Sequence, residues 1–146
     1  GGDALDIPSS GSLRPVTPET IEQRLNFVHM DGKAVFRFAT KVMGKTVETS
    51  LHRAGMEREE LDYLVPHQAN IRIIQAAAKR LVMPMEKVII NIHHYGNMSA
   101  ASIPVALAEA AHAHRFKKGD NIALAGFGAG LTWASCIMKW AKEENG

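Results

Sequence analysis

The sequence predicts an α/β protein in which helices cover a mixed, mostly parallel sheet. Three short apolar runs, which are typical of buried strands, each end in a polar or glycine-rich turn. Between them lie longer segments in which apolar residues recur every three or four positions, as in amphipathic helices. Strands that alternate with helices favour a parallel sheet with both faces covered. We therefore expect the three turns to meet at one site.

The first turn carries the residues with the most chemistry. The apolar run at 63–65 predicts a strand that Pro66 stops, and His67 stands at the break. Asn70 lies where the next helix would begin. In α/β proteins, a polar side chain after a strand is well placed for catalysis. A lone histidine at such a position is nevertheless more often structural, so His67 needs support from the other two turns.

The other two turns follow further strands. Val88–Asn91 predicts a strand, and Asn97 lies in the turn after it. Residues 122–125 predict a third strand, which ends in the glycine-rich turn Gly126–Gly130. The apolar segment 131–140 predicts a last strand that returns antiparallel to the third. Taken alone, Asn97 is a plain turn residue, and the glycine-rich turn lacks the Lys-Ser/Thr of a phosphate-binding loop.

Three helices are predicted, over residues 33–54, 71–81 and 99–114. The apolar positions of the first are Val35, Phe36, Ala39, Val42, Met43, Val47, Leu51 and Ala54, and Gly55 ends it. The residues expected to face inward in the second are Ile71, Ile74, Ala77, Ala78 and Leu81. The first half of the third helix is almost entirely small or apolar, which predicts burial on nearly all sides.

The two ends of the chain have weaker patterns. Residues 1–25 predict a connecting segment with a short strand near 4–7 and a helical turn that starts near 17–20. Asp31 is positioned to cap the first long helix, and residues 57–62 predict a short helix or turn. Residues 141–146 read as a polar tail.

Composition limits the classes of function. With 146 residues, 46% of them hydrophobic, the chain is long enough for one globular core. The formal net charge of +2 is too small to argue for a nucleic-acid ligand, and no apolar run approaches the roughly 20 residues of a membrane span. Cys136 is the one cysteine, which excludes an internal disulfide and fits a reducing, cytoplasmic compartment. Gly1 in place of Met leaves processing, trimming or origin in a longer chain open.

Together, the three motifs resemble the β-ketoacyl-acyl carrier protein synthase III family of condensing enzymes. His67 lies in Val-Pro-His-Gln-Ala-Asn, Asn97 lies in Tyr-Gly-Asn-Met-Ser-Ala-Ala-Ser, and residues 126–133 read Gly-Phe-Gly-Ala-Gly-Leu-Thr-Trp. The three motifs stand in the order of the family. The resemblance implies a thiolase fold, with two similar halves that each contain a five-stranded sheet. It also implies that residues 26–146 are the C-terminal half, without the nucleophilic cysteine of the N-terminal half.

The resemblance implies a decarboxylating Claisen condensation of acyl-CoA with malonyl-acyl carrier protein, which starts fatty-acid synthesis. The acyl group is loaded onto the missing cysteine, the malonyl thioester loses carbon dioxide, and its enolate attacks the acyl group. The implied role of His67 and Asn97 is to donate hydrogen bonds to the enolate oxygen. We expect His67 to be neutral and to be held in one tautomer by a partner on its other nitrogen. The sequence does not identify that partner.

Further roles follow from the same resemblance. Phe127 matches an aromatic residue beside the malonyl carboxylate, where an apolar wall favours loss of neutral carbon dioxide. Ala129 matches the backbone donor of the oxyanion hole in the acylation step. Gly32, Phe36 and Asn70 match positions that line the pantetheine tunnel. No metal or cofactor is expected, since the coenzyme A and carrier thioesters are substrates.

The implied protein partners are acyl carrier protein, the N-terminal half of the enzyme and, in the complete enzyme, a second copy. Carrier protein is acidic, so a basic surface is expected to bind it. The candidate residues are Arg72, Lys79 and Arg80 on the second helix, and Arg37 with Lys41 and Lys45 on the first. Basic stripes are usually just solvated faces, so docking by the first helix stays open.

Several residues have simpler readings, and alternatives to the main function remain open. Met98 stands where the family usually has Thr, and both Met98 and Cys136 read most simply as packing residues. The histidines outside the motif do not have metal-binding spacing and read as surface residues; they include His93, His94, His112 and His114. The alternatives are a condensing or acyl-transferring relative from a specialised pathway, or a non-catalytic half that only binds carrier protein.

Overall fold

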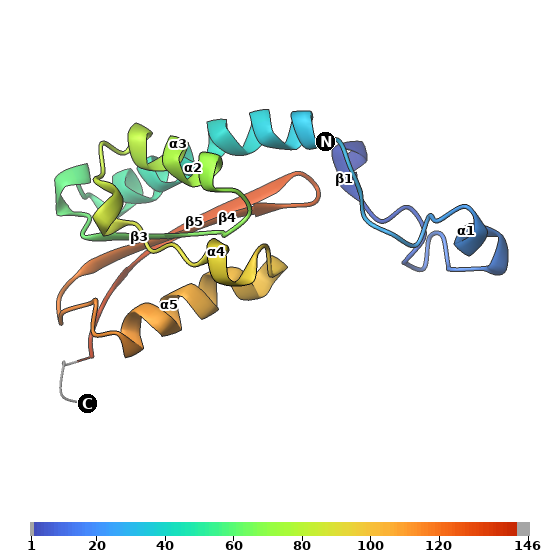
Figure 1. Ribbon diagram of the computed structural model, residues 1–146. Helices are drawn as coiled ribbons and strands as arrows, with labels where there is room; N and C mark the ends of the chain where they lie inside the picture. Colours follow the sequence, from blue (N-terminus) through green and yellow to red (C-terminus); the bar gives the residue numbers. More distant parts are fainter. Residues whose placement is uncertain (1, 143–146) are drawn as a thin grey trace. The chain divides into compact units, whose positions relative to one another are not determined.

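The computed structural model describes residues 2–142, and its contacts divide the chain into two units (Figure 1). Unit 1 contains the residues up to Phe38 together with Gly128–Thr132, and unit 2 contains Ala39–Phe127 and the residues from Trp133 on. Residues 143–146 of the predicted tail lie outside the described part.

Unit 1 contains little regular structure. The 3-10 turn η1 (Gly2–Ala4) precedes β1 (Leu5–Asp6), which pairs antiparallel with β2 (His29–Met30). The helix α1 (Pro18–Glu22) is capped by the preceding residue Thr17, which forms a reciprocal capping box with Thr20. The short strand and the helical turn predicted for this region are therefore confirmed.

The main sheet is built from three strands in the order β3-β4-β5. The strand β3 (Tyr63–Pro66) runs parallel to β4 (Asn121–Gly128), with Pro66 opposite Ala125. β5 (Thr132–Lys139) follows β4 and lies beside it, which makes the sheet mixed. β3 includes Pro66 and does not stop before it. The next residue still bonds to the ladder, because the His67 N–H donates to the Ala125 carbonyl over 2.8 Å.

The prediction of a five-stranded sheet was wrong for this chain, and the strand predicted at Val88–Asn91 forms only one bridge. Val88 pairs with Leu64 in parallel, and the Ile89 N–H donates to the Leu64 carbonyl over 2.8 Å. The segment then leaves the ladder because the N–H of Asn91 donates to the Gln68 side chain instead. The described strands form one three-stranded sheet and the two-stranded β1-β2 pair.

Helices cover both faces of the sheet in unit 2. Figure 1 shows α2 and α3 on one side of the strands and α4 and α5 on the other. The helices are α2 (Gly32–Ala54), α3 (Ile71–Arg80), α4 (Ile92–Tyr95) and α5 (Ser102–His112), and the short 3-10 turns are η2 (Arg58–Glu60), η3 (Met85–Lys87) and η4 (Ser99–Ala101). The three predicted long helices are thus present, whereas the single turn α4 was not predicted.

The helix α2 follows its periodicity closely. Its residues at four-residue steps from Ala39 to Leu51 are buried, and Gly55 ends the helix with a φ of 68°, which a glycine adopts at little cost. Gly44 allows a close contact with α3, because a Cβ at this position would lie 2.7 Å from Cδ of Arg80. The small residue therefore lets the Arg80 side chain cross over α2.

Two predictions of burial were wrong. For α3 the prediction holds for Ile74, Ala77, Ala78 and Leu81, which are buried, but Ile71 is 40% exposed. Ile73, which was not predicted to face inward, is buried in its place. In α5 only Ser102, Ala106 and Ala110 are buried, and Ala100 and Pro104 before and within the helix are exposed. One face of α5 lies on the sheet, so its small apolar residues on the other face are uncovered in this chain.

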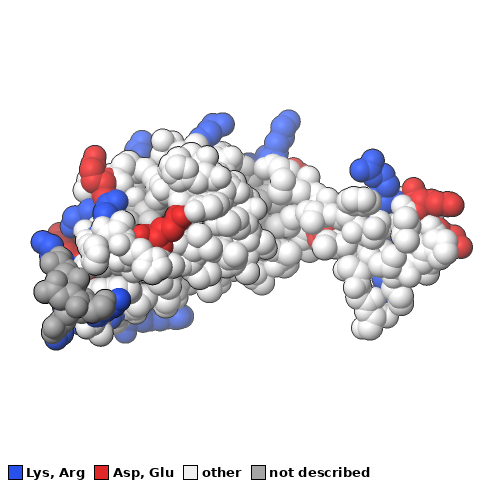
Figure 2. Space-filling model, turned by 60° about the horizontal axis from the view of Figure 1, so that its bottom comes forward, with Lys and Arg blue, Asp and Glu red and all other residues white. Residues whose placement is uncertain are grey.

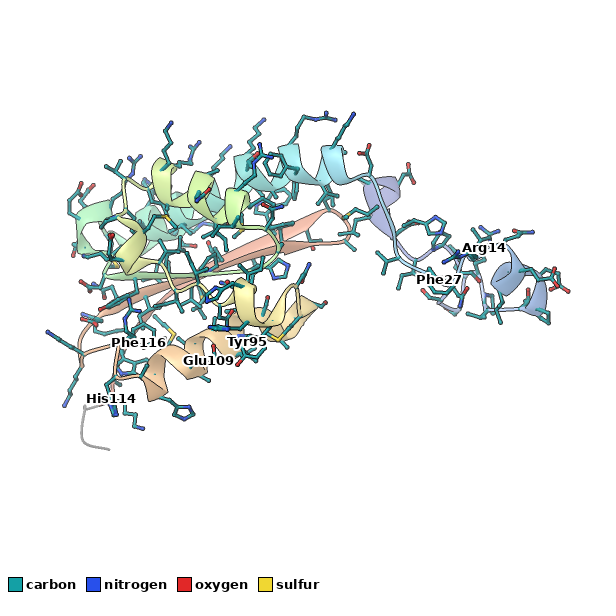
Figure 3. All side chains as sticks on the ribbon, viewed as in Figure 1. Arg14, Phe27, Tyr95, Glu109, His114 and Phe116 are labelled. Carbon is teal, nitrogen blue, oxygen red and sulfur yellow. The ribbon has the colours of Figure 1, made fainter. Side chains whose placement is uncertain are left out.

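A cluster of buried residues joins the sheet to α5. It consists of Val65, Ile89, Ala106, Ala110, Phe116 and Ile122. The Phe116 ring meets the Tyr63 ring edge-on, with 5.1 Å between centroids, and the Trp140 ring at 5.2 Å (Figure 3 labels Phe116). The aromatic contacts therefore close the end of unit 2 where β4 begins and β5 ends.

Two of the three isoleucines of α3 provide a test of the observed helix face. Ile74 is fully buried, so Ile74→Ala removes packed atoms and leaves a cavity. We expect a loss of about 2 to 5 kcal/mol in the free energy of unfolding, measured by urea denaturation. The control Ile71→Ala, on the partly exposed face, should cost less than about 1 kcal/mol. Equal losses in the two variants would contradict this orientation of α3.

Candidate active site

The backbone places His67 at the carboxyl end of β3. Its N–H continues the β3-β4 ladder through Ala125, so the residue begins its turn from a fixed position. Gly126 lies opposite, and a Cβ there would be 3.9 Å from Cβ of His67 and 3.3 Å from the end of Ile103. The small residue on β4 leaves room for the imidazole ring between the sheet and α5.

Two side chains fix the environment of the His67 ring. Nδ1 lies 2.5 Å from Oγ of Ser102, the first residue of α5. The Phe127 ring meets the imidazole edge-on, with the centroids 5.4 Å apart and the planes at 77°. Partial burial lowers the pKa of His67 below its ordinary value, since burial disfavours the charged ring. The neutral form is therefore favoured at neutral pH.

A short series of polar contacts connects His67 to Asn97. Ser102 Oγ also lies 2.9 Å from the carbonyl of Ser99, to which it can donate. The N–H of Ser99 in turn donates to Oδ1 of Asn97 over 2.9 Å. This contact orients the Asn97 amide so that its Nδ2 group points elsewhere and stays available as a donor. Two residues that are 30 positions apart in the sequence thus belong to one network.

The buried amide of Gln68 joins three segments around this network. Its Nε2 donates to the carbonyls of Pro66 and Ile89 over 2.8 and 3.1 Å. Its Oε1 accepts the N–H groups of Asn91 and Ile92 over 3.0 and 3.2 Å. The side chain has no solvent exposure, so these four bonds satisfy all of its polar capacity inside the protein. Gln68 therefore ties the end of β3 to the start of α4.

A second polar group supports α4 from α5. The Glu109 carboxylate accepts a 2.8 Å bond from Nδ2 of Asn91 and a short bond from the Tyr95 hydroxyl. Figure 3 shows Tyr95 and Glu109 close together on the neighbouring helices α4 and α5. The Tyr95 bond, followed by the Asn91 bond, lowers the pKa of Glu109, and the same contact raises the pKa of Tyr95. The two ends of α4 are thus both attached to α5. Asn97 follows α4 closely in the chain.

The other predicted substrate-binding residues lie in both units. In unit 2, Asn70 caps α3, since its side chain accepts the N–H of Arg72 over 2.9 Å. In unit 1, Gly32 begins α2 after the predicted cap Asp31, whose side chain accepts two backbone N–H groups at 3.0 Å. Phe36 and Ala129 also belong to unit 1. The structure therefore brings together His67, Asn97 and Phe127 within unit 2, whereas Gly32, Phe36 and Ala129 belong to unit 1.

The predicted carrier-binding residues differ in their surroundings. Arg72 and Lys79 are exposed on α3. Arg80 is engaged within the chain, because its Nη2 and Nε lie 2.7 and 2.9 Å from the Glu48 carboxylate of α2. Arg37, Lys41 and Lys45 are exposed along α2. Over unit 2, the face drawn in Figure 2 is largely uncharged and carries Lys and Arg mainly at its margins.

Sequence reasoning missed three residues of the site. Gln68 and Ser102 lie inside the quoted motifs, but nothing in the sequence shows that one is fully buried and that the other reaches Nδ1 of His67. Glu109 has only its helical position as a signal. The prediction that Cys136 is a packing residue was wrong, because it is exposed on β5. Among residues 2–142, no three His, Cys, Asp or Glu side chains are grouped to hold a metal ion.

The arrangement can supply two neutral hydrogen-bond donors next to an aromatic ring. A neutral imidazole donates from one nitrogen, and a primary amide donates from Nδ2. Fixed donors of this kind stabilise negative charge that develops on an oxygen during a reaction. The chemistry offered by these residues is therefore oxyanion stabilisation rather than nucleophilic attack.

Comparison with known proteins identifies the family of this site. Residues 51–140 match the family model described as 3-oxoacyl-[acyl-carrier-protein (ACP)] synthase III C terminal. The beta-ketoacyl-[acyl-carrier-protein] synthase III of Clostridioides difficile (strain 630) is 52% identical over 140 residues, which are 96% of this chain and 43% of that protein. The protein of the same name from Syntrophomonas wolfei is 46% identical over 145 residues, which are 99% of this chain and 44% of that protein.

Solved structures agree with this match. The crystal structure of 3-oxoacyl-(acyl carrier protein) synthase III, FabH, from Pseudomonas aeruginosa PAO1 superposes with a TM-score of 0.83 at 42% identity, covering 97% of this chain and 41% of that chain. The chain therefore spans less than half the length of these relatives. In the described part of the chain, every helix is too short or too polar to cross a membrane.

Removal of the Gln68 side chain tests its structural importance. Gln68→Ala leaves two N–H groups and two carbonyls without their partner in a buried region. We expect the free energy of unfolding to fall by at least about 2 kcal/mol, measured by urea denaturation. The control Gln75→Ala, at an exposed position of α3, should change it by less than about 0.5 kcal/mol. A Gln68 variant as stable as this control would show that water replaces the buried amide.

Proposed function

The chain belongs to the β-ketoacyl-[acyl-carrier-protein] synthase III family, and we propose that it supplies the decarboxylation half of such an enzyme's active site. The observation that carries the proposal is that Ser102 Oγ contacts both Nδ1 of His67 and the Ser99 carbonyl, while the Ser99 N–H donates to Asn97. The proposed reaction is the condensation of acyl-CoA with malonyl-acyl carrier protein. The nucleophilic cysteine comes from the N-terminal half, and residues 26–146 form the C-terminal half.

In this proposal, His67 and Asn97 stabilise the enolate of the malonyl thioester. Loss of carbon dioxide leaves negative charge on the thioester oxygen. Nε2 of a neutral His67 and Nδ2 of Asn97 would both donate to that oxygen. Donors that are already fixed need no rearrangement as the charge develops, which lowers the barrier. The network from Ser102 to Asn97 supports this role because it restricts both side chains before substrate binds.

The proposed role of Phe127 is to favour the loss of the carboxylate. Its ring packs edge-on against His67, so it would lie close to a malonyl group bound by the two donors. An apolar ring cannot solvate a carboxylate, whereas carbon dioxide is neutral. The same ring contributes to the apolar surroundings that keep His67 neutral. Ala129 would provide the backbone N–H for the oxyanion of the acylation step.

The proposed substrate path involves the pantetheine arm and its carrier. Asn70 already uses its oxygen to cap α3, so its Nδ2 group is the part that would donate to a pantetheine amide. Gly32 and Phe36 would line the same tunnel. Arg72, Lys79 and Arg37 are the preferred contacts for the acidic carrier protein. Arg80 is a further candidate, and its guanidinium pairs with Glu48 within the chain.

Substitution of the two proposed donors tests the catalytic role. In the complete enzyme, with the N-terminal half present, His67→Ala and Asn97→Ala should each slow malonyl-thioester decarboxylation by about 100-fold or more. Loading of the acyl group from coenzyme A should persist, because the cysteine performs that step. The control His112→Ala, at the exposed end of α5, should behave as wild type. Normal decarboxylation in both donor variants would leave only a non-catalytic, carrier-binding role for this chain.

Charge reversal at Arg72 tests the proposed dock. Arg72→Glu places a negative charge where an acidic partner would approach, so KM for malonyl-acyl carrier protein should rise about tenfold. Turnover of the same malonyl group on coenzyme A should change little, because that substrate brings no protein surface. The control Arg53→Glu alters an exposed residue near the end of α2 and should have little effect. An unchanged KM for the carrier substrate in Arg72→Glu would place the dock elsewhere.

A further inference from the structure

We infer that Ser102 is a positioning residue, which donates its hydroxyl proton to Nδ1 of His67 and thereby keeps the ring proton on Nε2. The inference rests on the proposed function of His67 as a donor to the enolate oxygen. It adds the residue that makes this donation possible. Ser102 lies on α5, away from β3 in the sequence, and the function proposed above does not assign the position of its hydroxyl proton.

The position of Ser102 leaves little freedom to its side chain. The residue has no solvent exposure, and Oγ is within hydrogen-bond distance of three groups. These are Nδ1 of His67 at 2.5 Å, the carbonyl of Ser99 at 2.9 Å and the backbone N–H of Gln68 at 3.4 Å. The Gln68 N–H can only donate, so it takes one acceptor site of the hydroxyl oxygen. The hydroxyl proton must then go either to Nδ1 or to the Ser99 carbonyl.

These two choices give His67 opposite chemical properties. If the hydroxyl donates to Nδ1, that nitrogen carries no proton, and the proton of the neutral ring is on Nε2. If the hydroxyl donates to Ser99, Nδ1 must carry the proton and donate to Oγ, and Nε2 becomes an acceptor. Only the first arrangement gives a neutral His67 that can donate to a developing oxyanion. Ser102 therefore decides whether the ring stabilises the enolate oxygen or repels it.

The proposed function of His67 favours donation to Nδ1, because only this arrangement leaves a proton on Nε2 for the enolate oxygen. The contact of Oγ with the ring nitrogen, at 2.5 Å, is also shorter than its contact with the Ser99 carbonyl. Ser99 is an exposed residue, and water can bind an exposed carbonyl that loses an internal donor. Fixing the tautomer from Nδ1 also leaves Nε2 on the far side of the ring for substrate.

The first measurement is the tautomer of His67 in the complete enzyme. Imidazole ¹⁵N chemical shifts distinguish a protonated from an unprotonated ring nitrogen, and the His67→Gln variant assigns the signals. We expect a proton on Nε2 and none on Nδ1 at neutral pH. A proton on Nδ1 would overturn the inference.

The second measurement is the tautomer of His67 in Ser102→Ala. Loss of a hydroxyl that donates to Nδ1 removes the group that keeps this nitrogen unprotonated, so the form with the proton on Nδ1 should become more populated than in the wild type. An unchanged position of the ring proton in Ser102→Ala would overturn the inference. A residue that merely fills space would not move the proton between the two nitrogens.

Kinetics of matched variants complete the test. Ser102→Ala should slow decarboxylation on the order of tenfold, as for other residues that fix a histidine tautomer, with acyl loading unchanged. Ser102→Thr keeps the hydroxyl and should restore both the rate and the wild-type tautomer. The control Thr49→Ala, at an exposed position of α2, should match wild type. If Ser102→Thr behaves as Ser102→Ala, the hydroxyl is not the active feature and the inference is wrong.

The design separates failure of this inference from failure of the proposed function. If His67→Ala retains full decarboxylation, the proposed function fails and the tautomer of the ring has no catalytic meaning. If His67→Ala is inactive while Ser102→Ala keeps the wild-type tautomer and rate, the function stands and only the role of Ser102 is wrong. Acyl loading, which depends on neither residue, shows in each variant that the enzyme is folded.

Discussion

The buried amide of Gln68 is the interaction on which the geometry of the site depends. Its oxygen and nitrogen satisfy backbone groups of β3, of the segment after Val88 and of the first turn of α4. A buried amide group without hydrogen-bond partners is costly, so the four bonds hold these segments at fixed distances from one another. His67 precedes Gln68 in the chain, and Asn97 follows α4 closely. One side chain therefore fixes the spacing between the two proposed donors.

The electronic state of His67 depends on other contacts. Burial and the Phe127 ring favour a neutral imidazole, and Ser102 contacts the nitrogen that faces away from substrate in the proposed mechanism. Both Ser102 and Glu109 belong to α5, so this helix contacts the ring and also supports α4. The position of the ring comes from the sheet, whereas the inferred position of its proton depends on Ser102 of α5. A change in the packing of α5 would alter the chemistry without moving His67.

The sequence predicted the elements better than their contacts. Regular periodicity located α2 and α3 to within about a residue, and the motif gave the end of β3. The buried face of α3 was misassigned at Ile71, because several apolar residues in a row fit two neighbouring faces equally well. The contacts of Ser102 and Gln68 could not be predicted, since they join residues separated by more than twenty positions. Such contacts depend on where the elements pack, which no local pattern contains.

The exposure of Asn97 explains why the proposed chemistry needs more than a nucleophile from the rest of the enzyme. A donor surrounded by water gains little from binding an oxyanion, because water competes for the same charge at a high dielectric constant. The small apolar residues that follow it, Ala100 and Pro104 among them, are also uncovered in this chain. We expect the N-terminal half to cover this surface and exclude water from the two donors. The network around Ser102 would then orient the donors, and the covering half would make their hydrogen bonds strong enough for catalysis.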